Sequence, residues 1–126
     1  MENLNGKKKI LLVDDDEIIL SHAKLILESE YEVITVKSGK EALKLLLQGL
    51  VPNLILLDIV MPNMDGWEIF NRLKNILVLQ KVPIAFVTSL REEKDEMQAY
   101  ELGAADFIKK PYIREDLLNR VKAIIK

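Results

Sequence analysis

Three aspartates follow directly after short apolar runs in this chain of 126 residues. Asp14 and Asp15 come after residues 10–13, and Asp58 comes after residues 54–57. Carboxylates that are brought together repel one another, so a cation or a proton must compensate them. Because no cysteine or histidine adjoins these acids, their chemistry favours a hard, oxygen-seeking ion such as Mg²⁺, with Mn²⁺ as an alternative, over zinc.

Asp58 is also a candidate nucleophile, since a carboxylate can attack phosphorus and form an aspartyl phosphate. Such a transfer needs a cation to neutralise the phosphoryl oxygens and a positioned hydrogen-bonding group. Lys110 and Thr88 also stand after short apolar runs, and they supply an ammonium and a hydroxyl. The residue types therefore predict a metal-assisted phosphoryl-transfer site made of Asp14, Asp15, Asp58, Thr88 and Lys110.

Five short apolar runs predict the strands that would position these side chains. Residues 10–13, 54–57 and 84–87 are almost wholly apolar, which indicates strands buried on both faces. Residues 31–36 and 105–108 are less uniformly apolar, as is typical of edge strands. We therefore predict three central strands and two edge strands.

Apolar residues at helical spacing predict a helix after each strand. The first is expected over about 16–29, and the second begins with a capping box at Ser38 and Glu41. The third is expected to continue through Ile76 and Leu77. In the fourth, over about 92–102, Met97 and Leu102 are predicted to face inward, and the last carries Leu117, Val121, Ile124 and Ile125 on one face.

The elements alternate strand and helix five times, which predicts an α/β fold with a doubly wound parallel sheet. Right-handed crossovers and the two edge strands favour the strand order 2-1-3-4-5. The topological switch point, where the order of the strands reverses, then falls between the first and third strands. This order predicts that Asp14 and Asp15 lie beside Asp58, at the carboxyl edge of the sheet.

Length and composition narrow the classes of function. The chain is long enough for one domain, expected over residues 1–126 with its core from about residue 7. A net charge of -2 and a pI near 5.5 argue against direct nucleic-acid binding. No signal peptide or membrane span is predicted, and the absence of cysteine is typical of a reducing cytoplasm.

Together these residues resemble the receiver domain of two-component response regulators, the CheY-like family with a flavodoxin-like (βα)5 fold. The resemblance covers about residues 7–126. It depends on Asp14-Asp15 after the first strand, Asp58 with Met61-Pro62 and Gly66 after the third, Thr88 after the fourth, and Lys110-Pro111 after the fifth. Each motif is weak alone, and their joint order is highly specific.

The resemblance implies roles for these residues. Asp58 would be the phosphoacceptor, and Asp15, Asp58 and the Val60 carbonyl would bind Mg²⁺, with Asp14 acting through metal-bound water. Thr88 and Lys110 would contact the phosphoryl group, the Lys110–Pro111 bond would be cis, and Phe107 would occupy the aromatic switch position.

The implied partners are a sensor histidine kinase or a histidine phosphotransfer protein. A downstream protein or a second copy would bind the face of the fourth helix, fifth strand and fifth helix. The chain would be no enzyme beyond its own phosphorylation and dephosphorylation. By the same resemblance, Val60 and Leu90 would flank the approach of water to the phosphorus. Both are apolar, which predicts slow dephosphorylation.

Three other functions fit the residues less well. A haloacid dehalogenase type phosphohydrolase would carry a second acid where Val60 stands. A nucleotide-binding module would need a glycine-rich loop after the first strand, where this chain has acids. A receiver-like module without phosphorylation is disfavoured by the complete set Asp15, Asp58, Thr88 and Lys110.

Overall fold

Strands and helices alternate along the chain in a computed structural model that describes residues 6–90 and 92–125. Residues 1–5, 91 and 126 of the predicted domain lie outside the described residues. The elements are β1 (Lys8–Val13), α1 (Glu17–Leu27), β2 (Tyr31–Val36), α2 (Gly39–Leu47), β3 (Leu54–Asp58), α3 (Gly66–Lys74), the 3₁₀ turn η1 (Leu77–Leu79), β4 (Ile84–Thr88), α4 (Glu93–Leu102), β5 (Asp106–Lys109) and α5 (Arg114–Ile124). None of the described helices is long and apolar enough to cross a membrane.

The five strands form one parallel sheet in the order β2-β1-β3-β4-β5, which confirms the predicted topology. In the register of the central strands, Val13 pairs with Leu57, and Asp58 pairs with Val87. On the outer side of β4, Thr88 pairs with Lys109. The polar residues that follow these strands therefore meet at one edge of the sheet.

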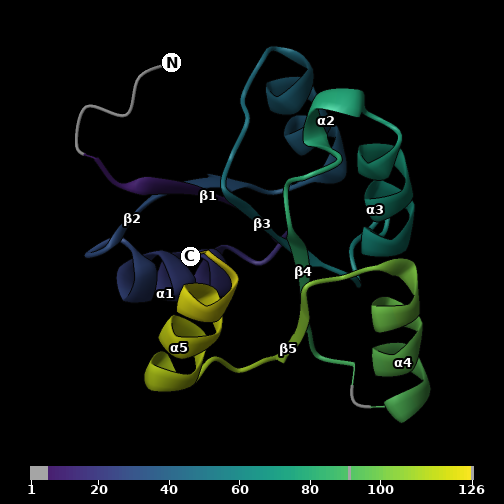
Figure 1. The fold of residues 1–126 in the computed structure, drawn as a ribbon. Helices are drawn as coiled ribbons and strands as arrows, with labels where there is room; N and C mark the ends of the chain where they lie inside the picture. The colour runs from purple at the N-terminus through teal and green to yellow at the C-terminus, as the bar shows by residue number, and fades with distance from the viewer. Residues whose placement is uncertain (1–5, 91, 126) are drawn as a thin grey trace.

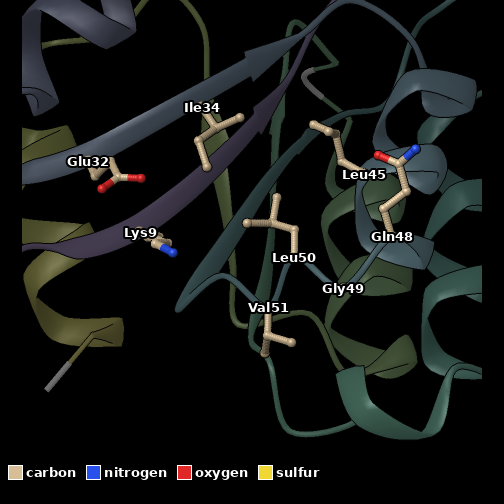
Figure 2. A pocket seen from close by; sticks show the side chains of 8 residues that line it. All are labelled: Lys9, Glu32, Ile34, Leu45, Gln48, Gly49, Leu50 and Val51. Carbon is tan, nitrogen blue, oxygen red and sulfur yellow. The ribbon is translucent and has the colours of Figure 1, made fainter. Parts of the chain in front are cut away.

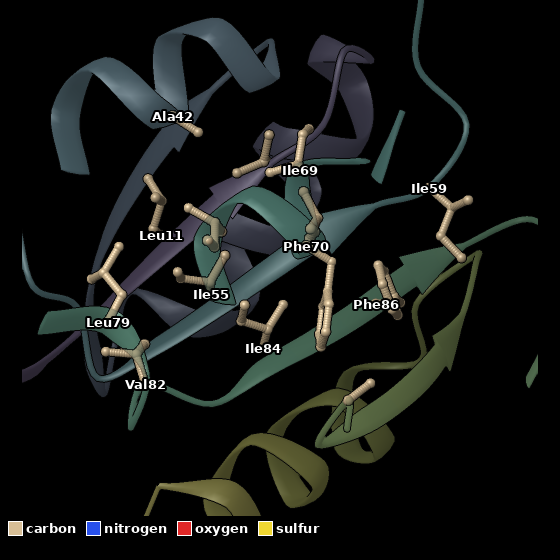
Figure 3. Close-up of a cluster of buried hydrophobic side chains, with 14 of the residues drawn as sticks. Leu11, Ala42, Ile55, Ile59, Ile69, Phe70, Leu79, Val82, Ile84 and Phe86 are labelled. Atoms are coloured by element: carbon tan, nitrogen blue, oxygen red, sulfur yellow. The ribbon is translucent and has the colours of Figure 1, made fainter. Parts of the chain in front are cut away.

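Helices cover both faces of the sheet, α1 and α5 on one side and α2, α3 and α4 on the other (Figure 1). Alternate residues of each central strand point to opposite faces. Leu11, Ile55 and Phe86 pack in the cluster under α2 and α3 (Figure 3). Their neighbours Leu12 and Leu56 pack in the cluster under α1 and α5. Two-sided burial explains why these strands are almost wholly apolar.

Side-chain caps fix where three helices begin. Asp16 accepts hydrogen bonds from the backbone N–H groups of Ile18 and Ile19 at the start of α1. Ser38 does the same for Glu41 in α2, which is one half of the predicted capping box, whereas the Glu41 carboxylate accepts the N–H of Lys37. Asp65 caps α3. Each cap satisfies backbone donors that have no partner within the helix.

Two helix predictions are wrong. The third helix ends at Lys74, because the Asn75 amide donates to the Asn71 carbonyl and the chain then tightens into the η1 turn. In α4 the buried residue is Ala99, whereas Met97 is 55% exposed and Leu102 is 39% exposed. Met97 lies roughly 200° around the helix from Ala99. Because Ala99 faces the sheet, Met97 points away from it.

Gly66 lets the loop after β3 fold back against the strand. Its N–H donates to the Ile59 carbonyl over 2.8 Å. A Cβ at this position would lie 2.3 Å from the backbone oxygen of Asp58 and 2.7 Å from Ile59 Cα. Backbone atoms cannot move aside cheaply, so any side chain here would displace the residues that carry Asp58.

We expect Gly66→Ala to lower the free energy of unfolding by about 1–3 kcal/mol, the usual range for overpacking. Gly39→Ala is the matched control, because its Cβ would meet side-chain atoms of Ile69, 2.5 and 2.7 Å away, which can shift. Its loss should be smaller. Urea unfolding of both variants measures the difference, and equal losses would contradict the argument from backbone contact.

Candidate functional site

The carboxyl edge of the sheet gathers four of the predicted site residues. Asp14 and Asp58 follow the paired residues Val13 and Leu57 of β1 and β3. The Lys110 N–H donates to the Thr88 carbonyl over 2.8 Å, which ties the end of β5 to the end of β4. The Lys110–Pro111 peptide bond is cis, as the resemblance implied.

The three aspartates form one cluster. Asp14, Asp15 and Asp58 can each offer a carboxylate oxygen, and these oxygens all lie within 4.8 Å of one another. Asp14 is fully buried and Asp58 is 3% exposed, whereas Asp15 is exposed. The cluster is therefore open to solvent on the Asp15 side and closed behind Asp14.

Lys110 bridges the two buried carboxylates. Its Nζ lies 2.5 Å from Asp14 Oδ2 and 3.1 Å from Asp58 Oδ1. The other oxygen of Asp14 accepts the N–H of Asp16 over 3.0 Å. One ammonium thus compensates two carboxylates, and it does so from a side chain that is itself mostly buried.

Burial and the neighbouring charges shift the pKa values of Asp58 and Lys110. Burial first, and then the negative charge of Asp14, raise the pKa of Asp58 from 3.8 to about 6, against the opposing charge and hydrogen bond of Lys110. Burial lowers the pKa of Lys110, but its hydrogen bond to Asp14 and the charges of Asp58 and Asp14 outweigh this and raise it. Lys110 stays an ammonium at neutral pH, while the Asp58 proton is held more tightly than usual.

The donor set fits a divalent cation. Three carboxylates and one ammonium leave two negative charges at the cluster. The ligand atoms are all oxygen and one side of the cluster reaches solvent, as suits a Mg²⁺ ion that keeps several waters. The observed acids are therefore chemically suited to the metal that the sequence predicts.

The structure places the remaining predicted residues around this cluster. Thr88 is fully buried, and its hydroxyl oxygen accepts the N–H of Leu90 over 3.0 Å. Phe107 is already inside the core, at 2% exposure. Val60 is 56% exposed and Leu90 is half-buried, so both apolar side chains lie near the surface, in the loops after β3 and β4.

One residue near the site was missed by sequence reasoning. Tyr112 is buried, and its hydroxyl has no hydrogen-bond partner among the described residues. Burial raises the pKa of Tyr112, and so do the charges of Asp14 and Asp58. Leaving a buried hydroxyl unpaired costs about 1–3 kcal/mol. The sequence signal that could have identified Tyr112 is its position two residues after Lys110.

A separate groove of about 530 Å³ opens at the other edge of the sheet (Figure 2). It is lined by residues near the starts of β1 and β2 and by the connection from α2 to β3: Lys9, Glu32, Ile34, Leu45, Gln48, Gly49, Leu50 and Val51. Because these are the amino ends of parallel strands, the groove lies away from Asp58. It contains none of the predicted site residues.

Comparisons with known proteins agree with this geometry. The profile of the response regulator receiver domain matches residues 10–122. The alkaline phosphatase synthesis transcriptional regulatory protein PhoP of Bacillus subtilis is 41% identical over 120 residues, which are 94% of this chain and 49% of that protein. The chain spans about half the length of the curated relatives it matches.

Two solved structures show the same fold. One is the signal receiver domain of a signal transduction histidine kinase from Syntrophus aciditrophicus, 35% identical, with a TM-score of 0.82 over 94% of this chain and 89% of that one. The other is the Mn²⁺-bound form of response regulator Rcp1, 30% identical, with a TM-score of 0.78 over 93% of this chain and 91% of that one.

The raised pKa of Asp58 predicts a pH dependence of stability in metal-free buffer. The folded chain binds this proton more tightly than the unfolded chain, so folding gains stability as the pH falls through about 6 toward 3.8. Asp58→Asn has no such proton. We expect the variant to be more stable than the native chain at pH 7 by about 1–3 kcal/mol, and this difference to shrink by pH 4.

Urea unfolding between pH 4 and 8 measures this difference. Asp65→Asn is the matched control, because Asp65 is an exposed carboxylate that caps α3 and asparagine caps equally well. A difference between the native chain and Asp58→Asn that does not change with pH would contradict the prediction.

Proposed function

This chain belongs to the response regulator receiver domain family of two-component systems, whose general function is phosphorylation-dependent signalling, and we propose that Asp58 is its phosphoacceptor. The donor is the phosphohistidine of a sensor histidine kinase or of a histidine phosphotransfer protein. A bond forms between an Asp58 oxygen and phosphorus while the bond from phosphorus to the histidine nitrogen breaks. The observation that carries this proposal is the buried Asp58 carboxylate, held by Lys110 within a cluster of three acids.

The site supplies a nucleophile in the right state. With its pKa near 6, Asp58 is mostly ionised at neutral pH. Lys110 lies against it and compensates the charge that the phosphoryl oxygens bring. Thr88 Oγ1 accepts a hydrogen bond from Leu90 N–H, so its own proton remains to be donated to a phosphoryl oxygen.

Mg²⁺, with Mn²⁺ as an alternative, would neutralise charge on the transferred group. Asp15, Asp58 and the Val60 carbonyl would hold it, and Asp14 would act through metal-bound water. The acidic cluster and the Mn²⁺-bound neighbour Rcp1 support this assignment. Because Asp15 is the exposed member of the cluster, the ion would enter from its side.

The signal would leave through the face formed by α4, β5 and α5. Phosphorylation would draw the Thr88 hydroxyl toward Asp58 and let the buried Phe107 ring repack in the space it leaves. The face exposes Met97 and Ile113, and it carries the ion pair of Arg120 with Asp106. Apolar side chains among charges suit a protein partner or a second copy of this chain. We infer no direct nucleic-acid or membrane partner and a cytoplasmic reaction.

The rival phosphohydrolase function needs a general acid two positions after the nucleophile. Val60 stands there with an exposed apolar side chain, so it has no proton to give. We therefore propose that the chain transfers phosphoryl groups only to and from itself.

Intact-mass measurement tests the phosphoacceptor. After incubation with Mg²⁺ and acetyl phosphate, we expect a single phosphoryl adduct on the native chain and none on Asp58→Asn. Omitting Mg²⁺ should prevent the adduct, and Asp15→Ala should slow it strongly because a direct metal ligand is lost. Asp65→Asn, at the exposed cap of α3, should be modified like the native chain. An adduct on Asp58→Asn would refute the assignment.

The lifetime of the phosphorylated state gives a second test. Neither Val60 nor Leu90 can orient a water for attack on phosphorus, so dephosphorylation should be slow. Val60→Asn combined with Leu90→Glu offers hydrogen-bonding groups at these positions. We expect the phosphorylated variant to decay about tenfold faster, as one positioned water worth about 1.4 kcal/mol of barrier predicts. Decay is followed after removal of the donor at constant Mg²⁺, and an unchanged rate would show that these side chains do not control water.

A further inference from the structure

Tyr112 buries a hydroxyl for which packing gives no reason. The side chain is 6% exposed and belongs to the cluster under α1 and α5. The centroid of its ring lies 6.3 Å from that of His22 on α1. Phenylalanine would fill the same apolar space without burying a polar atom, and the hydroxyl has no hydrogen-bond partner among the described residues. A buried hydroxyl of this kind is explained if it has a hydrogen-bond partner in another state of the protein.

Asp14 and Tyr112 lie on the same side of the sheet. Leu12 packs with Tyr112 in the cluster under α1 and α5, and Asp14, two residues further along the chain, points to the same face. The charges of both buried carboxylates act on the Tyr112 hydroxyl. Their charges add to burial in raising the pKa of Tyr112, and Asp14 has the larger effect of the two. The phenol therefore keeps its proton at neutral pH and remains a hydrogen-bond donor. Donation to a carboxylate gives a stronger bond than donation to a neutral acceptor.

Asp14 is the carboxylate that needs another hydrogen-bond donor when Asp58 carries a phosphoryl group. Its Oδ1 accepts the Asp16 N–H, and Lys110 Nζ lies 2.5 Å from its Oδ2. The same ammonium lies 3.1 Å from Asp58 Oδ1. When Lys110 turns toward a phosphoryl group on Asp58, a fully buried oxygen of Asp14 loses its compensating charge.

We propose that Tyr112 is a positioning residue whose hydroxyl donates a hydrogen bond to Asp14 Oδ2, directly or through one water, when Lys110 engages a phosphoryl group on Asp58. The inference rests on the proposed function. An ionised carboxylate has about four acceptor sites. Asp14 can therefore keep the Asp16 N–H and a metal-bound water while it accepts the Tyr112 hydroxyl.

Tyr112→Phe separates this role from packing, because it removes the hydroxyl and keeps the ring. Beryllofluoride with saturating Mg²⁺ serves as the stable mimic of the phosphoryl group. We expect the variant to bind beryllofluoride about tenfold more weakly, equal to about 1.4 kcal/mol. In metal-free buffer the same variant should be at least as stable to urea as the native chain, because the lost hydroxyl was unpaired there.

Tyr31→Phe is the matched control. Tyr31 is buried to 7% exposure in the same cluster, but it begins β2 at the far edge of the sheet. Its substitution should leave beryllofluoride binding unchanged. The ¹³Cζ shift of Tyr112, which responds to hydrogen bonding of the phenol, should change on beryllofluoride binding, and that of Tyr31 should not.

The outcomes distinguish the two proposals. A native chain that takes up neither acetyl phosphate nor beryllofluoride overturns the proposed function and this inference with it. A native chain that binds, together with a Tyr112→Phe variant of equal affinity, overturns the Tyr112 role alone. A variant that is both less stable in metal-free buffer and weaker in binding shows that the side chain acts through packing, and this too overturns the role.

Discussion

The ion pair of Lys110 with Asp14 and Asp58 is the interaction on which the rest of the site depends. A buried carboxylate without a partner is strongly unfavourable, and breaking a buried pair costs about 3–5 kcal/mol. One ammonium here serves two such carboxylates, so neither is fully compensated. Burial and the charge of Asp14 raise the pKa of Asp58. The net negative charge of the cluster favours a divalent cation.

Parallel pairing explains how residues from distant parts of the chain reach this ion pair. The strands run in one direction, so the residues that follow them meet at one edge, and the register sets Asp14 and Asp58 side by side. The Lys110 backbone is then held by the Thr88 carbonyl. The strands that precede Asp14 and Asp58 are packed by apolar side chains on both faces. This rigid scaffold positions site residues that lie in the loops after the strands.

The α4 helix buries little of its side-chain volume against the sheet. Because Ala99 is its buried residue, α4 packs close to the sheet with little side-chain volume, and its larger apolar residues point outward. The adjoining β5 strand runs directly into Lys110. A small movement at Thr88 and Lys110 would therefore act on a helix with few buried contacts, which is the kind of element that shifts at low cost.

The sequence alone determined the strand order, the edge strands, the helix cap at Ser38, and the set Asp14, Asp15, Asp58, Thr88 and Lys110. These follow from apolar runs and from residue types with restricted chemistry, both of which are local properties. Tertiary structure decided what depends on neighbours distant in the chain. It turned Met97 outward, because burial of α4 is set by the sheet beneath it and not by residue size. It ended α3 at Lys74, and it made Lys110 shared between two carboxylates. It also buried the Tyr112 hydroxyl without a hydrogen-bond partner among the described residues, because α1 and α5 pack over that side of the sheet.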